Sequence, residues 1–305
     1  MRAKWAYDFR VDLQVVCPRC KGALAEDDRL RCTACKVSYP VLDGVPLLVG
    51  PELTNQHQQQ RQYFDASFSG YERYTVENWR LSYLIRIYEE LAVLDGGSPY
   101  LDVGVGGSGA TVIEAAKRGV PAAGCDLSVE GVLAARRFAE TEGVADRSRF
   151  VVCAAEALPF AERTFGAVSA VALLEHVDDD RAVVAEIARV ATPEARVFLM
   201  VPHAFRFMPP PAWPFYWWHD RRIGHKRHYD EAQLVRLCAA VGLEHVSTRY
   251  TAHPVKLLQA AAAIVMPRLR ERNSRTWWRL EALDRRAGGR RLGALHMSAV
   301  FRRLP

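Results

Sequence analysis

The segment that most constrains the fold of this chain is a glycine-rich stretch, Tyr100–Thr111, which reads Tyr-Leu-Asp-Val-Gly-Val-Gly-Gly-Ser-Gly-Ala-Thr. The apolar residues up to Val103 predict the end of a buried strand, and residues 113–118 predict a helix. The turn between them is almost free of side chains, so a nucleoside ligand can approach the backbone N–H groups at the helix N-terminus. The stretch therefore predicts a nucleoside-binding strand–turn–helix unit.

Two acidic residues refine the nature of that ligand. Asp102 lies two residues before the first glycine, where a pyrophosphate would be repelled and a cationic ligand would be attracted. Asp126 ends the next apolar run, at the position where an acidic side chain binds ribose hydroxyls. A carboxylate in the loop and another at the ribose favour S-adenosylmethionine, which carries a sulfonium, over a dinucleotide. The alternative is a glycine-rich turn with two solvated carboxylates.

The patterns that follow the glycine-rich stretch indicate a family. They are the runs Val151–Phe160, Phe165–Val168, Leu173–Val177, Glu186–Val190 and Val197–Pro202. In this order they resemble the class I S-adenosylmethionine-dependent methyltransferases of the type 11 group, which includes quinone-biosynthesis methylases. The resemblance is close over residues 100–202. It implies an α/β, Rossmann-like fold with a mostly parallel seven-stranded sheet, and five strand–helix alternations in this region independently predict a parallel sheet covered on both faces.

The resemblance also implies cofactor contacts. Asp102 and Gly104 lie near the methionine end, Asp126 binds the ribose, and Ala154 and Ala155 flank the adenine. Further expected cofactor contacts are Gly106, Leu127, Glu156 and Leu173. Two positions depart from the family pattern. Ser108 stands where the loop usually has a glycine, and Ala154 stands where an aspartate usually binds the adenine amine. These departures predict weaker binding, or an adenine held by backbone atoms alone.

Two Cys-x-x-Cys pairs near the N-terminus predict a metal site. Cys17, Cys20, Cys32 and Cys35 are arranged so that each pair directs both sulfurs to one side of a tight turn. Two such turns close a tetrahedral site of the kind that structural zinc prefers, without an open position for catalysis. Disulfides are the alternative, and the absence of a secretory signal argues against them. Residues 13–49 resemble the zinc ribbons associated with methyltransferases.

The domain organisation follows from these segments. We expect a zinc ribbon over residues 1–50, a polar linker and N-terminal helices over 51–94, and a methyltransferase domain over 95–305. The linker covers residues 51–62, and apolar residues at helical spacing follow it up to residue 94. Tyr63, Phe64, Tyr71 and Tyr74 are candidates to cover the cofactor, although packing aromatics is the favoured interpretation.

The predicted substrate side begins after the strand that ends at Pro202. Residues 203–229 form an aromatic, proline-rich segment that we interpret as a lid, with an aromatic satellite core as the alternative. Its Gly-His-x-Arg-x-Tyr string resembles the substrate segment of the same methylases. Candidate general bases are His225, His228 and His203, with Arg227 and Tyr229 orienting the acceptor. We expect the sheet edge to bring Glu175, His176 and His203 into the same crevice as the cofactor residues.

Residues 252–293 form a predicted insertion before a last strand over 294–301. The insertion begins with an apolar helix, Val255–Met266, which is too short to cross a bilayer. Residues 268–305 then contain eleven arginines and three acidic residues. Such a segment is either a solvated face or a contact for RNA or an anionic membrane. A net charge of +6 and no signal peptide predict a cytoplasmic protein.

Three functions are compatible with these patterns. The favoured one is methyl transfer from S-adenosylmethionine to a small, hydrophobic or ring-bearing metabolite. The first alternative is an rRNA or tRNA methyltransferase that uses the ribbon and the basic C-terminal segment. The second is a non-catalytic scaffold with a degenerate cofactor site, for which Ala154 gives some support. Measured cofactor affinity separates the scaffold from the enzymes, and the acceptor pool that is labelled separates the two enzymes.

Overall fold

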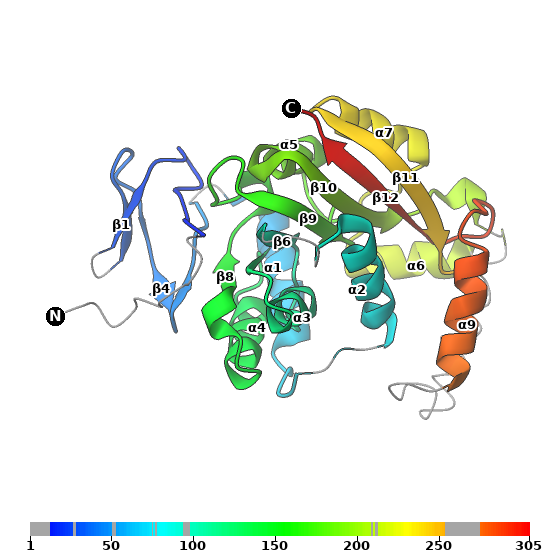
Figure 1. Ribbon diagram of the computed structural model, residues 1–305, viewed down its shortest axis with the longest axis horizontal. Coiled ribbons are helices and arrows are strands. Elements are labelled where there is room, and N and C mark those ends of the chain that lie inside the picture. The colour runs from blue at the N-terminus through cyan, green and yellow to red at the C-terminus, as the bar shows by residue number, and fades with distance from the viewer. Residues whose placement is uncertain are drawn as a thin grey trace.

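A seven-stranded sheet organises the chain, whose computed structural model describes residues 13–26, 29–50, 53–74, 76, 78–93, 98–208, 210, 213–253 and 275–305 (Figure 1). The strands are β6 (Tyr100–Val103), β7 (Ala122–Asp126), β8 (Ser148–Val152), β9 (Phe165–Val171), β10 (Ala191–Pro202), β11 (Leu243–Thr251) and β12 (His296–Arg303). Their order across the sheet is β11-β12-β10-β9-β6-β7-β8. Strands β6 to β10 run parallel, and β12 is antiparallel to both neighbours. The predicted mostly parallel seven-stranded sheet is confirmed.

Helices cover both faces of this sheet. Its main helices are α3 (Ala110–Lys117), α4 (Val129–Thr141), α5 (Asp180–Val190) and α7 (Glu231–Ala239). In Figure 1, α3 and α4 lie beneath the sheet and α5 and α7 lie above it. Successive side chains of a strand point to opposite faces, so Phe198 packs in the hydrophobic core below while Leu199 packs in the core above. The sheet is therefore buried on both sides, as parallel sheets require.

One predicted helix is replaced by a short turn. The alternation of strands and helices predicts a helix between β8 and β9, but the chain forms only the 3₁₀ turn η2 (Ala155–Ala157) there. A similar turn, η1 (Ala145–Arg147), precedes β8. Pro159 follows η2 closely, and a proline disfavours helical backbone in the residue before it. The connection consequently stays short and keeps Ala154 and Ala155 at the end of β8.

Two helices precede the sheet, α1 (Asn55–Phe68) and α2 (Asn78–Leu91). The prediction that residues 51–62 form a linker was wrong from Asn55 onward. Thr54 caps the helix by accepting a hydrogen bond from the backbone N–H of His57, whose ring accepts one in return from the Thr54 N–H. Glutamine is a good helix former, so this capping box is enough to begin a helix in a polar stretch.

The N-terminal ribbon contains five short strands, β1 (Leu24–Glu26), β2 (Leu30–Cys32), β3 (Ser38–Tyr39), β4 (Val41–Leu42) and β5 (Val45–Pro46). It lies against the outer edge of β8 (Figure 1). The Leu48 N–H donates to the Val152 carbonyl oxygen at 2.8 Å, and the Val16 N–H donates to the Pro159 carbonyl oxygen at 2.9 Å. Lys21 adds an ion pair with Glu186 of α5 at 2.7 Å. The ribbon thus covers an edge strand that would otherwise expose unpaired backbone groups.

The segment after β10 contains η3 (Phe205–Phe207) and α6 (Trp213–Ile223), and α9 (Arg275–Arg286) precedes β12. The backbone of His203 pairs with that of Tyr229, which brings the two ends of the segment together. The apolar helix predicted over residues 255–266 lies outside the described residues. None of the helices that the structure describes is long and apolar enough to span a bilayer.

Candidate functional site

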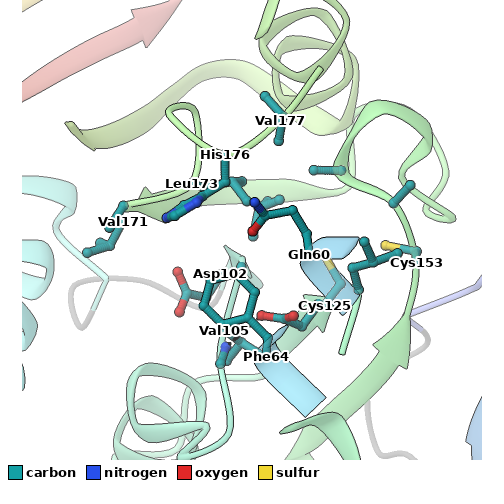
Figure 2. A pocket seen from close by; sticks show the side chains of 18 of the residues that line it. Gln60, Phe64, Asp102, Val105, Cys125, Cys153, Val171, Leu173, His176 and Val177 are labelled. Carbon is teal, nitrogen blue, oxygen red and sulfur yellow. Dashed lines mark hydrogen bonds between the residues drawn. The ribbon is translucent and has the colours of Figure 1, made fainter. Parts of the chain in front are cut away.

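A cavity of about 250 Å³ opens at the carboxyl ends of β6, β7, β8 and β9 (Figure 2). All nine residues that the sequence predicts as cofactor contacts line it, namely Asp102, Gly104, Gly106, Asp126, Leu127, Ala154, Ala155, Glu156 and Leu173. They come from four different strand ends. Carboxyl ends of parallel strands meet at one edge of a sheet, which is where ligands bind in open α/β folds.

The glycine-rich turn forms the floor of this cavity because side chains would not fit there. Gly104 has a positive φ of 81°, and a Cβ atom on it would lie 3.2 Å from the Leu173 side chain. A Cβ atom on Gly107 would lie 2.8 Å from the Phe68 ring. The turn is therefore packed closely between α1 and the loop after β9. Because it has few side chains, its backbone directly borders the cavity.

Asp126 is held at the cavity wall by the backbone of two loops. Its Oδ2 accepts from the Gly106 N–H at 2.9 Å, and its Oδ1 accepts from the Ser128 N–H at 2.9 Å. Burial raises the pKa of the Asp126 carboxyl, and the backbone hydrogen bonds oppose this shift. Each oxygen keeps a second lone pair, so the carboxylate can still accept hydrogen bonds from a ligand.

Asp102 is 4% exposed at the end of β6 and belongs to a hydroxyl network. Ser169 donates to its Oδ1 at 2.5 Å, and Thr111 donates to its Oδ2. The hydroxyl groups of Tyr100 and Ser169 lie 2.6 Å apart, which extends the network into the core. These contacts fix the carboxylate at the loop, where it presents negative charge to the cavity.

Helix α1 forms the roof, and of its lining residues the sequence analysis named only Phe64 as a candidate cover. Gln60 and Phe64 extend from α1 to the cavity near His176 and Asp102 (Figure 2), and Gln56, His57 and Phe68 complete the α1 lining. His57 Nε2 lies 3.2 Å from the Glu156 carboxylate, and the proximity of this carboxylate raises the pKa of the imidazole. The roof is thereby tied to the β8 end.

Of the four aromatic residues considered as covers in this region, only Phe64 lines the cavity. Tyr63 is 39% exposed. Tyr71 and Tyr74 pack against the lower hydrophobic core, with Tyr74 donating to Glu114 at 2.9 Å. The favoured interpretation as packing aromatics fits Tyr71 and Tyr74, whereas Phe64 both stacks on Phe68 and lines the cavity, so it stays a candidate cover.

A row of imidazole rings leads from the cavity into the substrate-side segment. His176 lines the cavity, with its ring centroid 5.4 Å from that of Phe64 and 4.8 Å from that of His225. His225 Nδ1 lies 2.8 Å from Asp220 Oδ1. Glu175 is 1% exposed, and burial raises the pKa of its carboxyl to about 8.

None of the five predicted acceptor-side residues, His203, His225, Arg227, His228 and Tyr229, lines the cavity. His203 is fully buried, with Nδ1 donating to the Ala294 carbonyl oxygen and the ring stacked on Phe207. The expectation that His203 and Glu175 share the crevice was wrong, because β10 carries His203 onward to its pairing with Tyr229, and Glu175 turns into the interior. Burial lowers the pKa of His203.

The side chains of Arg227 and Tyr229 form an ion pair and hydrogen bonds with the residues around the start of α5. The Arg227 guanidinium lies 3.3 Å from the Asp180 carboxylate and donates to the Asp178 carbonyl oxygen at 3.0 Å. The Tyr229 hydroxyl donates to Asp180 at 2.7 Å. These contacts fix the segment against the N-terminus of α5. His225 contacts His176 on the side away from the cavity, and Asp220 bridges His225 and His228.

The four predicted metal ligands Cys17, Cys20, Cys32 and Cys35 converge in the ribbon. The Sγ atoms of Cys17 and Cys35 are 3.6 Å apart, and those of Cys20 and Cys32 are 3.4 Å apart. Sulfurs at about 2.3 Å from a tetrahedral zinc are separated by about 3.8 Å, whereas a disulfide requires about 2.05 Å. The cluster therefore fits zinc and excludes the disulfide alternative.

The surroundings of these sulfurs also suit a metal. The Cys35 N–H, 3.4 Å from Cys32 Sγ, lowers the pKa of Cys32 to about 6, which favours the thiolate that binds metal. The Tyr39 hydroxyl lies 3.1 Å from Cys17 Sγ and supplies an outer hydrogen bond. No motif singles out Tyr39, which lies in the short strand after the second cysteine pair.

Comparisons with known proteins agree with this architecture. Residues 101–199 match the family model described as "Methyltransferase domain", and residues 15–44 match "Trm112p-like protein". Norajmaline N-methyltransferase of Rauvolfia serpentina is 30% identical over 156 residues, 51% of this chain and 52% of the relative. The tRNA 5-carboxymethoxyuridine methyltransferase of Escherichia coli K12 is 34% identical over 113 residues, 37% and 40% of the two chains.

The solved structures show the same fold at low identity. The geranyl diphosphate C-methyltransferase of Streptomyces coelicolor superposes with a TM-score of 0.61 at 14% identity, covering 82% of this chain and 99% of that one. The chain spans about half or less of the length of the two curated relatives described above. The chain therefore contains a methyltransferase domain over residues 101–199, on the fold of the S-adenosylmethionine-dependent methyltransferases. It also carries a Trm112p-like segment, the zinc ribbon, over residues 15–44.

Proposed function

We propose that this protein transfers a methyl group from S-adenosylmethionine to a small, largely apolar acceptor. The observation that carries the proposal is the cavity at the strand ends. Its wall contains the carboxylates of Asp102 and Asp126, and the rings of Phe64 and Phe68 cover it. Pockets for small molecules commonly join such an apolar lining to a few placed polar groups. None of the described residues that line the cavity is lysine or arginine.

In this proposal the predicted cofactor residues contact different parts of S-adenosylmethionine. Asp126 accepts hydrogen bonds from the ribose hydroxyls, and Asp102 faces the cationic methionine end. Ala154 and Ala155 border the adenine, which is then held by backbone atoms and by packing. The bound cofactor supplies an electrophilic methyl group, so the protein has to align the acceptor and exclude water. Phe64 and Phe68 supply that exclusion from above.

The acceptor enters from the side of His176 in this scheme. His176 lines the cavity from the loop after β9, and His225 and Asp220 lie behind it. A general base is needed only if the acceptor nucleophile carries a proton that must leave. His176 replaces the more distant His203, His225 and His228 as our candidate for that base.

A second candidate is methylation of an RNA base, which the 34% identity to a tRNA methyltransferase favours. Nucleic-acid sites depend on lysine and arginine contacts to phosphates. Lys226 and Arg227, in the loop after α6, form ion pairs with Asp178 and Asp180, and no lysine or arginine is among the described residues that line the cavity. The small-molecule proposal is therefore preferred.

Turnover of labelled S-adenosylmethionine tests the proposal. The purified protein is incubated with separate pools of cellular RNA and of small-molecule extract, and label in each product pool is counted. We expect label in the small-molecule pool that disappears in an Asp102→Asn, Asp126→Ala double variant. Label confined to RNA would establish the second candidate, and tight cofactor binding without label in either pool would indicate a scaffold.

Replacing Asp126 by alanine is expected to weaken S-adenosylmethionine binding by ~1–3 kcal/mol, or about 5- to 150-fold, because a charged hydrogen-bond acceptor is lost. Isothermal titration calorimetry measures the change. Asp146→Ala is the matched control, since Asp146 lies in η1 with its side chain 42% exposed, away from the cavity. Equal affinities for the parent and Asp126→Ala would show that the ribose is held elsewhere.

A further inference from the structure

A second cluster of potential metal ligands lies behind His176, remote in sequence from the ribbon. Each oxygen of the Asp220 carboxylate faces a different imidazole, with Oδ1 at 2.8 Å from His225 Nδ1 and Oδ2 at 2.7 Å from His228 Nε2. All three side chains are 11% exposed. One ligand atom from each lies within 4.8 Å of the other two. The cluster has the composition of a two-histidine, one-carboxylate metal site.

The contacts of His228 place its Nε2 directly against a carboxylate oxygen. Its Nδ1 lies 2.9 Å from the His203 carbonyl oxygen, which can only accept, so Nδ1 carries a proton. A neutral ring then leaves Nε2 as an acceptor, yet Nε2 faces a carboxylate oxygen at 2.7 Å. Two acceptors at this distance repel each other unless a proton or a metal ion lies between them.

A second carboxylate lies beside the cluster, on the other side of the His225 ring. Glu175 Oε1 lies 3.8 Å from His225 Nε2, and Glu175 Oε2 is buried without a hydrogen-bond partner among the described residues. A buried carboxylate oxygen that lacks a partner is costly, and a nearby cation reduces that cost. Glu175 comes from the loop after β9, whereas the other three residues belong to α6 and the loop that follows it.

We propose that Asp220, His225 and His228 bind a divalent transition-metal ion. Ligand atoms at about 2.0–2.2 Å from such an ion are separated by about 3.0–3.5 Å, so the two short contacts need to open by less than about 1 Å. The hydrogen bond from His228 Nδ1 to the His203 carbonyl is the outer contact that orients a ligating imidazole. The ion would tie α6 to the loop that follows it, beside the proposed acceptor side.

Cobalt provides a test that distinguishes this site from the ribbon. The full-length protein is purified from cells grown with Co²⁺ in place of zinc, and its cobalt content and absorption spectrum are measured. Sulfur ligands give intense charge-transfer bands, whereas nitrogen and oxygen ligands do not. We expect about two cobalt equivalents per chain, and about one in His228→Ala with the charge-transfer bands unchanged.

His245→Ala is the matched control, because His245 also lies near a carboxylate, at 3.9 Å from Glu231, but on the outer strand β11. It should keep both equivalents. If His228→Ala fails to fold by circular dichroism, Asp220→Asn removes the ligand charge with little change in shape and should lose the same equivalent. One equivalent in the parent protein, or an unchanged content in a folded variant, would overturn the proposal and leave a proton between Asp220 and His228.

Discussion

The Cys32→Ser protein is expected to lose the metal of its ribbon and to unfold residues 13–50. Cys32 belongs to the tightest sulfur pair, at 3.4 Å from Cys20, and its Sγ is the thiolate favoured by the Cys35 N–H. Binding of structural zinc supplies about 10–16 kcal/mol to small ribbons, far more than five short strands can gain from packing. Loss of the sulfur-to-cobalt bands in cobalt-grown protein measures the effect.

Cys238→Ser is the control for this variant, because Cys238 is a buried thiol in α7 that has no place in the cluster. It should keep the ribbon metal and its spectrum. Susceptibility of residues 13–50 to limited proteolysis should rise in Cys32→Ser alone. Retention of the full spectrum by Cys32→Ser would mean that the four cysteines do not form the site.

The second large effect is expected at His176. Replacement by glutamine should reduce methyl transfer by ~10²–10⁴-fold if the acceptor must lose a proton, the usual contribution of a general base. Affinity for S-adenosylmethionine should change by less than about 5-fold, because His176 contacts Phe64 and His225 and lies on the acceptor side. Single-turnover rates and calorimetry on the same preparation separate the two quantities.

His245→Gln serves as the control for a surface imidazole on β11. A pH profile adds a readout that a packing role would not change: the limb that reports the base should disappear in His176→Gln. Loss of cofactor affinity with normal single-turnover rates would show that His176 closes the cofactor site. Unchanged turnover would show that the acceptor needs no base.

The cofactor side of the cavity was predictable because its residues are local in sequence. A strand, a glycine turn and the acidic residue that ends the next strand fix one another's positions through the parallel sheet alone. Asp102, Gly104 and Asp126 consequently line the cavity together, as the pattern indicates. The cysteine pairs were predictable for the same reason, since two short turns bring their own sulfurs together.

The cover of the cavity, the position of His203 and the Asp220 cluster depend on tertiary packing, which local sequence patterns do not reveal. Helix α1 has no fully buried residue and a polar, glutamine-rich sequence, so periodicity gave no reason to place Gln60 and Phe64 over the cavity. His203 illustrates the converse, because it lies at a strand end and is nevertheless buried against Phe207. The placement of Asp220 beside His225 and His228 required the fold of α6, which the sequence suggested only as an irregular lid.

The position of the ribbon couples zinc supply to the solubility of the whole chain. β8 is the last strand of the sheet, and the backbone groups of Val152 on its free side are occupied by Leu47 and Leu48 of the ribbon. A chain made without zinc would fold its sheet with this edge uncovered, and an uncovered edge strand is a template for pairing with another chain. Zinc starvation should then cause self-association through β8 before it affects the methyltransferase chemistry itself.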